Sequence, residues 1–202
     1  MKTEAIVRSL LRENELRPRR GFGQNFLVDD AILGAIARAS VDDGARSIVE
    51  IGAGLGTLTQ KLAETGVEVI AVEVDRNLVP ILTTRFRDNP RVRIVEADAL
   101  HVRYETFLGP SGEKASVAGN QPYNISSPLA FSMLEQRRFL GRATVMLQRE
   151  VAARVAAGPV SRTYGAISVL LGTYADVTHV LDVGPESFFP KPKVHSSVIQ
   201  LR

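Results

Sequence analysis

Apolar positions along this chain follow two kinds of pattern, stripes at helical spacing and short continuous runs. Between residues 6 and 11 they recur at helical spacing, which predicts a helix that ends before Pro18. A second helical stripe lies between residues 32 and 36, and either Asp29 or Asp30 is placed to cap its N-terminus. From residue 46 onwards, short apolar runs typical of buried strands alternate with helical stripes.

This alternation predicts an α/β fold with a mostly parallel sheet and helices on both faces. The runs that predict strands are RSIVEI, VEVIAVEVD, VRIVEAD, KASVAGN and RATVMLQ, and the stripes that predict helices are LTQKLAETG, LVPILTTRF, SPLAFSMLEQ and REVAARVAAG. The last part, YGAISVLLGTYA, DVTHVLDVG and VHSSVIQLR, is a helix followed by two strands. Because no helix separates these two strands, they predict an antiparallel hairpin at the sheet edge.

Composition fits one soluble domain. The 202 residues are 45% hydrophobic and suffice for one buried core, so residues 1–202 are expected to form a single domain with a helical and basic N-terminal segment. The chain has no cysteine, no membrane-spanning run and no secretory signal, which predicts a cytoplasmic protein without membrane contact. A net charge of +3 permits a nucleic-acid partner without requiring one.

A glycine turn follows the first strand of the alternating series. In EIGAGLGTLT, Gly52, Gly54 and Gly56 allow positive φ angles and leave bare backbone for a ligand. A dinucleotide fingerprint would place its third glycine at Thr57, so the spacing fits nicotinamide or flavin cofactors poorly. As an alternative interpretation, a glycine-rich turn from strand to helix occurs in many α/β proteins.

Acidic residues stand where the next two strands should end. Glu73 can accept both hydroxyls of a ribose, and Asp98 can accept from an adenine amino group. Together with the glycine turn they predict an adenosine pocket without a pyrophosphate cradle, which indicates S-adenosylmethionine as the cofactor. Exposed acids at strand ends are the alternative interpretation.

The segment GNQPYNISSP follows the fourth of these strands, at the same sheet edge. The amide oxygen of Asn120 and the backbone carbonyl of Gln121 could accept both N–H bonds of an adenine amine, which would localise its lone pair. Pro122 would fix that carbonyl, and the ring of Tyr123 would stack on a base taken out of its helix. The alternative is a turn that carries no chemistry.

Seven segments resemble, in order and spacing, the small-subunit (16S) ribosomal RNA adenine N6-dimethyltransferase family. They are GQNFLVDD, VEIGAGLGTLT, EVDRNL, EADAL, NQPYNISSP, LQREVAAR and VGPESFFPKPKVHSS. The resemblance runs from about residue 19 to residue 201, and its N-x-P-Y and F-x-P-x-P-x-V-x-S elements are specific when found together. It implies a Rossmann-like class I methyltransferase with a seven-stranded sheet.

The family transfers two methyl groups to N6 of each of two adjacent adenosines in a hairpin near the 3′ end of small-subunit ribosomal RNA, and it contributes to ribosome biogenesis. By motif, the residues implied to bind the cofactor are Gln24, Asn25, Leu27, Gly52, Gly54, Glu73, Asp98 and Asn120, and those implied to act at the target base are Asn120, Pro122, Tyr123 and Phe188. Phe188 would close the side of the base opposite Tyr123; a core aromatic is its other interpretation.

Two features depart from the family pattern. Gln121 stands where members usually carry an apolar residue, and we expect it to tune activity because the backbone carbonyl has the proposed role. Members also continue into a small helical domain, whereas this sequence stops at Arg202. From this we expect cofactor binding to survive while affinity and activity on ribosomal substrate fall.

Three basic clusters could form a phosphate-binding rim if they converge on the cofactor face; a solvated surface is the alternative. They are Arg17, Arg19 and Arg20; Arg137, Arg138 and Arg142; and Lys191 and Lys193.

The isolated histidines, His101, His179 and His195, share no metal-ligand spacing, so no metal is expected. The chain is expected to act as a monomer on ribosomal RNA of the assembling small subunit. Two other functions stay open, namely the related antibiotic-resistance methyltransferases of large-subunit RNA and an RNA-binding factor without turnover.

Overall fold

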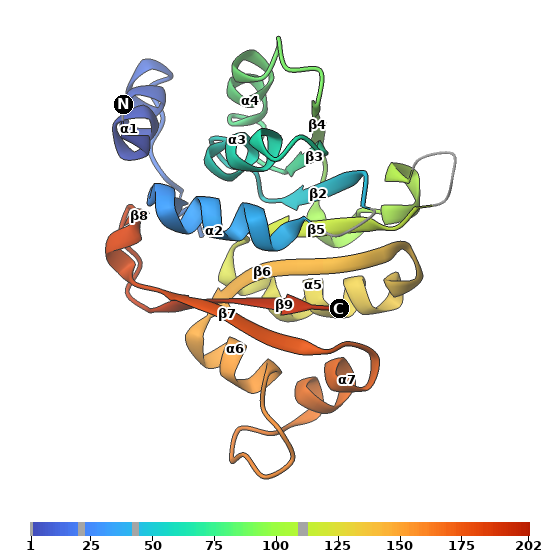
Figure 1. Cartoon of the computed structure of the whole chain (residues 1–202). Coiled ribbons are helices and arrows are strands. Elements are labelled where there is room, and N and C mark those ends of the chain that lie inside the picture. Colours follow the sequence, from blue (N-terminus) through green and yellow to red (C-terminus); the bar gives the residue numbers. More distant parts are fainter. Residues whose placement is uncertain (1, 20–22, 42–44, 109–112) are drawn as a thin grey trace.

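Within residues 2–19, 23–41, 45–108 and 113–202, which the computed structural model describes, seven strands form one sheet in the order β4-β3-β2-β5-β6-β9-β7 (Figure 1). The strands are β2 (Ser47–Ile51), β3 (Glu68–Glu73), β4 (Val92–Glu96), β5 (Ala115–Gly119), β6 (Leu140–Gln148), β7 (Val177–Val183) and β9 (Ser196–Leu201). The strands β4, β3, β2, β5 and β6 are parallel. The predicted α/β fold with a seven-stranded, mostly parallel sheet is confirmed.

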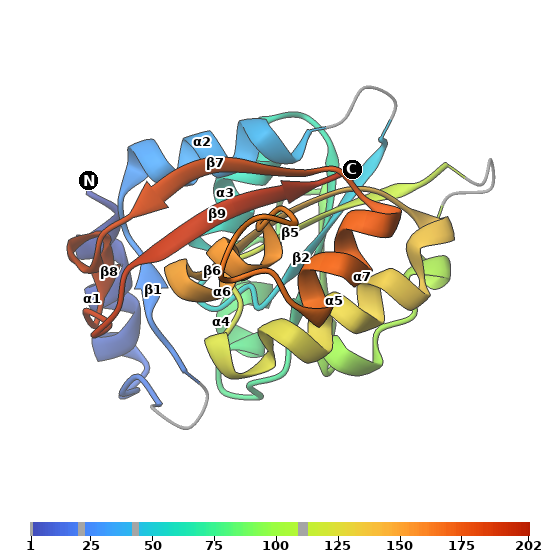
Figure 2. The same cartoon turned by 90° about the horizontal axis from the view of Figure 1, so that it is seen from below.

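Helices cover both faces of the sheet. They are α1 (Thr3–Glu13), α2 (Asp30–Ser40), α3 (Thr57–Glu64), α4 (Val79–Arg85), α5 (Ser126–Glu135), α6 (Arg149–Val155) and α7 (Ala166–Tyr174). Neighbouring strand residues point to opposite faces, so Ile48 packs with α2 and α3 while Val49 packs with α5. Figure 2 shows α2 on one side of the sheet and α5, α6 and α7 on the other.

The edge hairpin is also confirmed, because β9 pairs antiparallel with β7. It pairs antiparallel with β6 as well, so the last strand is inserted between the two. The connection from β7 to β9 contains β8 (Phe188–Phe189), which pairs antiparallel with β1 (Phe26–Leu27) from the N-terminal segment in a second, small sheet. The sequence did not predict this sheet, because two-residue strands are too short to show any periodicity.

The sequence allowed two candidates for the N-cap of α2, Asp29 and Asp30, and the structure distinguishes them. The carboxylate of Asp29 accepts hydrogen bonds from the backbone N–H groups of Ala31 (3.0 Å) and Ile32 (3.2 Å). Asp29 is therefore the N-cap, and Asp30 is the first helical residue.

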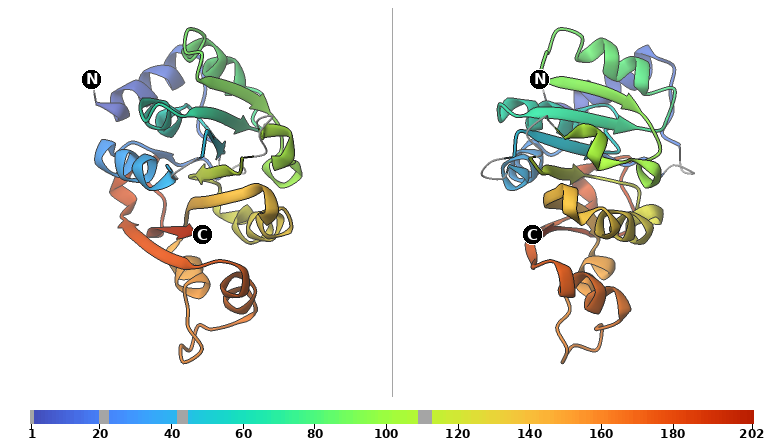
Figure 3. Two further views of the ribbon diagram at one scale, coloured as in Figure 1. Left: turned by 45° about the vertical axis from the view of Figure 1, so that its right-hand side comes forward. Right: turned by 90° about the vertical axis from the view of Figure 1, so that its right-hand side faces the viewer.

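Helix α1 lies beside α4, away from α6 and α7 (Figure 3). Its buried residues Val7 and Leu11 join Leu78 and Ile81 in one apolar cluster. Among the described residues, no helix combines the length and the apolar character that crossing a membrane would need.

The strand order reverses between β2 and β5. After β2 the chain adds β3 and β4 on one side, and it then returns to add β5 and β6 on the other. The carboxyl ends of β2 and β5 therefore lie next to each other without a helix between them, which is where open α/β sheets bind ligands.

Gly56, the residue before α3, is expected to tolerate no side chain. Its φ is +78°, and an added Cβ would lie 2.5 Å from Cε2 of the Phe86 ring. Backbone strain and overpacking together predict that Gly56→Ala lowers the free energy of unfolding by about 2–4 kcal/mol, measured by urea denaturation. Gly66→Ala is the matched control, because Gly66 also has positive φ (+90°) but faces open space. Equal losses in the two variants would contradict the packing part of this account.

Candidate functional site

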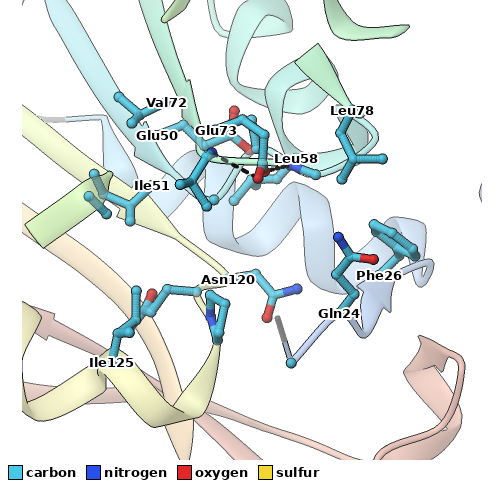
Figure 4. A pocket seen from close by; sticks show the side chains of 18 of the residues that line it. Gln24, Phe26, Glu50, Ile51, Leu58, Val72, Glu73, Leu78, Asn120 and Ile125 are labelled. Carbon is cyan, nitrogen blue, oxygen red and sulfur yellow. Dashed lines mark hydrogen bonds between the residues drawn. The ribbon is translucent and has the colours of Figure 1, made fainter. Parts of the chain in front are cut away.

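A cavity of about 330 Å³ opens at the carboxyl ends of β2, β3 and β5 (Figure 4). Its volume lies within the range of small-molecule sites. Every residue predicted to bind the cofactor lines it; these are Gln24, Asn25, Leu27, Gly52, Gly54, Glu73, Asp98 and Asn120. Pro122 and Tyr123 line it as well. Glu73 and Asn120, separated by 47 positions, therefore face one cavity.

The glycine turn and the loop after β5 lie in close contact. Gly52 has a φ of +72°, and a Cβ added to it would lie 3.7 Å from the Cα of Gln121 and 3.8 Å from Cδ of Pro122. The N–H groups of Gly52 and Ala53 donate to the carbonyl of Val72 at 2.9 and 3.1 Å. The turn therefore presents bare backbone to the cavity and is hydrogen-bonded to the end of β3.

Glu73 is held at the end of β3 by backbone donors. Its carboxylate accepts hydrogen bonds from the N–H groups of Gly54 (2.7 Å), Val74 (2.9 Å) and Asp75 (2.9 Å). Burial raises the pKa of Glu73, and these hydrogen bonds oppose the rise. Three bonds leave a carboxylate with lone pairs for a further donor, such as a ribose hydroxyl.

Asp98 lies on the next strand connection and is half exposed. Its carboxylate accepts from the backbone N–H of Leu100 at 2.9 Å, and Oδ2 lies 3.1 Å from Nδ1 of His101. The first bond caps the short 3₁₀ helix Ala99–His101 and thereby fixes the direction of the carboxylate.

Glu50 is a third acid that lines the cavity, and sequence reasoning missed it. The side chain is 1% exposed and accepts a hydrogen bond of 2.5 Å from Oγ1 of Thr59. Burial raises the pKa of Glu50 to about 8, against the opposing effect of the Thr59 bond. An acid inside the apolar run SIVEI was the available signal, because a carboxyl group is rarely placed in a buried strand without a function.

Asn120 faces the cavity, and the N-terminal segment holds its amide. Nδ2 of Asn120 donates to the backbone carbonyl of Asn25 at 3.3 Å. This bond assigns the nitrogen to the side of Asn25 and leaves Oδ1 as the acceptor for another group. Pro122, with φ of −56°, follows Gln121 and restrains the backbone there.

Tyr123 is anchored from the far end of the chain. Its hydroxyl lies 2.6 Å from Oγ of Ser196, the first residue of β9. Burial raises the pKa of Tyr123, and the contact with Ser196 restrains the orientation of its ring. This contact connects the N-x-P-Y and P-x-V-x-S elements physically, and Ser196 is a second site residue that sequence reasoning did not name.

Phe188 does not line the cavity, contrary to its predicted place beside the target base. Its ring is 2% exposed and packs in the apolar cluster that contains Val183 and Val198. The pairing of β8 with β1 sets Phe188 opposite Leu27 and turns it into the core. The next residue, Phe189, is partly exposed, and the guanidinium of Arg8 lies 3.9 Å from its ring centre.

The basic residues do not converge on one rim. Arg142 is 8% exposed and donates to the carbonyl of Val41, so it has a structural role. Arg137 and Arg138 precede β6 and lie at the amino edge of the sheet, opposite the cavity. Of the other predicted rim residues, Arg17, Arg19, Lys191 and Lys193 are exposed, and Arg20 lies outside the described residues.

The chemistry of the cavity fits S-adenosylmethionine. The carboxylates of Glu73 and Asp98 line it, and none of its described lining residues is a lysine or an arginine. Carboxylates favour a cationic ligand and repel phosphates, so a sulfonium nucleoside suits the cavity and a dinucleotide does not. In the described ranges, no three acidic or histidine side chains gather as metal ligands would.

Comparison with known proteins gives a consistent result. The family model described as "Ribosomal RNA adenine dimethylase" matches residues 15–202. "Ribosomal RNA small subunit methyltransferase A" of Geobacter metallireducens is 44% identical over 190 residues, which are 94% of this chain and 69% of that protein. The protein of the same name from Anaeromyxobacter sp. (strain K) is 42% identical over 200 residues, covering 95% of this chain and 70% of the other.

Two solved structures have similar folds. A dimethyladenosine transferase from Plasmodium falciparum superposes with a TM-score of 0.73 at 29% identity, covering 86% of this chain and 61% of that one. The 23S rRNA methyltransferase ErmE superposes with a TM-score of 0.76 at 28% identity, covering 88% and 69%.

Replacing the buried amide at position 121 is expected to cost no activity. The side chain of Gln121 is 2% exposed, and its Oε1 has no hydrogen-bond partner among the described residues. Gln121→Leu keeps the backbone carbonyl and should raise the free energy of unfolding by about 1 kcal/mol. Urea denaturation and a methyl-transfer assay measure the two effects. A large loss of turnover in a folded variant would give the side chain itself a role.

Glu50 is expected to make stability depend on pH. Its pKa is about 8 in the folded chain against 4.5 without burial, so the folded state keeps a proton that the unfolded state releases. The stabilisation is complete below about pH 4.5 and is lost as the pH rises through about 8. Glu50→Gln should remove a fall on the order of 3 kcal/mol between about pH 5 and pH 9, measured by urea denaturation without cofactor. Equal pH slopes in both proteins would refute this.

Proposed function

The chain belongs to the ribosomal RNA adenine dimethylase family, and from this premise we propose that it transfers methyl groups to N6 of two adjacent adenosines in a hairpin near the 3′ end of small-subunit ribosomal RNA. It is an S-adenosylmethionine-dependent ribosomal RNA methyltransferase. The observation that carries the proposal is that Asn120 shares one cavity with Glu73 and Asp98. Residues 1–202 would act as one catalytic domain in assembly of the small subunit.

The residues of the cavity would bind the cofactor through both its adenosine part and its methionine part. Glu73 would accept from the ribose and Asp98 from the adenine, while the bare backbone at Gly52 would lie along the methionine part. When bound, S-adenosylmethionine supplies an electrophilic methyl group on its sulfonium. The carboxylates favour that positive charge, because the cavity is partly shielded from solvent.

The acceptor side must overcome the low nucleophilicity of an adenine amine, whose lone pair is delocalised into the ring. Oδ1 of Asn120 and the carbonyl of Gln121 would accept its two N–H bonds, which localises the lone pair and stabilises charge as it develops. Tyr123 would stack on the extruded base. The product ammonium then releases its proton to water, so no strong protein base is needed.

Two other functions are less well supported. The fold likeness to ErmE does not separate large-subunit from small-subunit substrates, but relatives named for the small subunit are 42–44% identical over more than nine-tenths of the chain. An RNA-binding factor without turnover would not need both Asn120 and Tyr123 in the cavity.

The substrate can be identified by following labelled methyl groups. The chain is incubated with labelled S-adenosylmethionine and either undermethylated small subunits or unmodified large-subunit RNA, and the label is then mapped. We expect label on two neighbouring adenosines of the small-subunit RNA. Label confined to large-subunit RNA would overturn the proposal, and so would the absence of label despite cofactor binding when the chain is extended by the family's C-terminal helical domain.

Asn120→Ala is expected to lower the transfer rate about 100-fold or more, because it removes one of two acceptors for the amine. Affinity for RNA should stay near that of the unchanged chain, since most RNA affinity comes from contacts to phosphates. Asn14→Ala at the exposed end of α1 is the control. Single-turnover kinetics and filter binding measure the two quantities, and near-normal turnover would exclude the assigned role.

A further inference from the structure

Asp75 is a buried carboxylate just beyond the end of β3. It is 4% exposed, and its Oδ2 accepts a hydrogen bond of 2.7 Å from Nε2 of Gln24. Its Oδ1 accepts from both nitrogens of Asn77, the backbone N–H at 3.0 Å and Nδ2 at 2.8 Å, and it lies 3.6 Å from Nη1 of Arg19. A buried carboxylate with this many hydrogen-bond partners restrains the side chains that donate to it, here those of Gln24 and Asn77.

Gln24 is engaged at both ends of its amide. While Nε2 donates to Asp75, Oε1 accepts the backbone N–H of Arg19 at 2.8 Å. The backbone N–H of Gln24 also donates to the carbonyl of Arg19 at 3.3 Å. Gln24 borders the cavity, but its amide is already committed to the protein, so its part in cofactor binding is to hold the wall in place.

The next residue reaches the opposite side of the cavity. The carbonyl of Asn25 accepts the bond from Nδ2 of Asn120, after β5, and residues 26 and 27 pair with β8. A continuous series of contacts therefore runs along the cavity wall from Asp75 through Gln24 and Asn25 to Asn120. Figure 4 shows the side chains of Gln24 and Asn120 bordering the same cavity.

We propose that Asp75 and Gln24 are positioning residues that hold the carbonyl of Asn25 where it orients the amide of Asn120. The inference rests on the proposed function, because it assumes that Oδ1 of Asn120 accepts from the target amine. If the carbonyl of Asn25 moves away, the Asn120 amide can turn over and present N–H groups to the N–H bonds of the amine. The same movement opens the wall formed by residues 23–27.

A swapped pair of side chains tests the contact. Gln24→Glu sets two carboxylates against each other, and Asp75→Asn removes the charge that Gln24 binds. The double variant Gln24→Glu with Asp75→Asn restores an amide–carboxylate bond in the opposite direction, because Nδ2 of the new asparagine can donate to the new glutamate. The glutamate can still accept from the backbone N–H of Arg19.

Two quantities are measured for each variant below its melting temperature. The dissociation constant for S-adenosylmethionine is measured by calorimetry without RNA, and the single-turnover transfer rate is measured at saturating cofactor. We expect Gln24→Glu to weaken cofactor binding about tenfold and to slow transfer about tenfold, and the double variant to recover most of both losses. Asp88→Asn, an exposed carboxylate beyond α4, should change neither.

A structural role alone would lower the melting temperature and leave the saturated rate unchanged. Three results would therefore overturn the proposal: wild-type values in Gln24→Glu, a double variant no better than the worse single variant, or loss of cofactor affinity with an unchanged transfer rate. Because the binding measurement uses no RNA, it still tests the Asp75–Gln24 contact if the chain proves inactive on small-subunit RNA.

Discussion

The contact between the glycine turn after β2 and the polar loop after β5 is the constraint on which the site depends. These segments meet because β2 and β5 are parallel neighbours at the point where the strand order reverses. The positive φ of Gly52 favours glycine there, and a Cβ at this position would lie at ordinary van der Waals distance from the loop. Gly52 of the turn and Asn120 of the loop therefore line one cavity.

Charge determines what such a cavity can accept. Buried carboxylates are normally unfavourable. At Glu73 a backbone N–H group stabilises the charge, and at Glu50 burial raises the pKa to about 8, which favours the neutral form. The lining has no described basic residue, so the site favours a cationic nucleoside over a nucleotide. The polyanionic substrate must then be bound by surfaces outside the cavity, where exposed residues such as Lys191 and Lys193 lie.

Segments from both ends of the chain form hydrogen bonds with the loop after β5, residues 120–123. Ser196, on the last strand, fixes the hydroxyl of Tyr123, and the N-terminal segment fixes the amide of Asn120. The small sheet of β1 and β8 joins these two segments to each other. Motifs that lie nearly the whole chain apart in sequence are thus parts of one hydrogen-bonded shell around the site.

The sequence alone determined the sheet, its helices and the edge hairpin, because long apolar periods report directly which faces are buried. It also placed Glu73, Asp98 and Asn120 at one edge, since parallel strands end on the same side. Only the tertiary structure decided the rest. Phe188 points into the core, Arg142 donates to the carbonyl of Val41, and Arg137 lies at the far edge, although the sequence predicted a contact with the substrate for each. These outcomes depend on pairing between distant segments, such as Phe188 with Leu27, and no local pattern records which distant residues will meet.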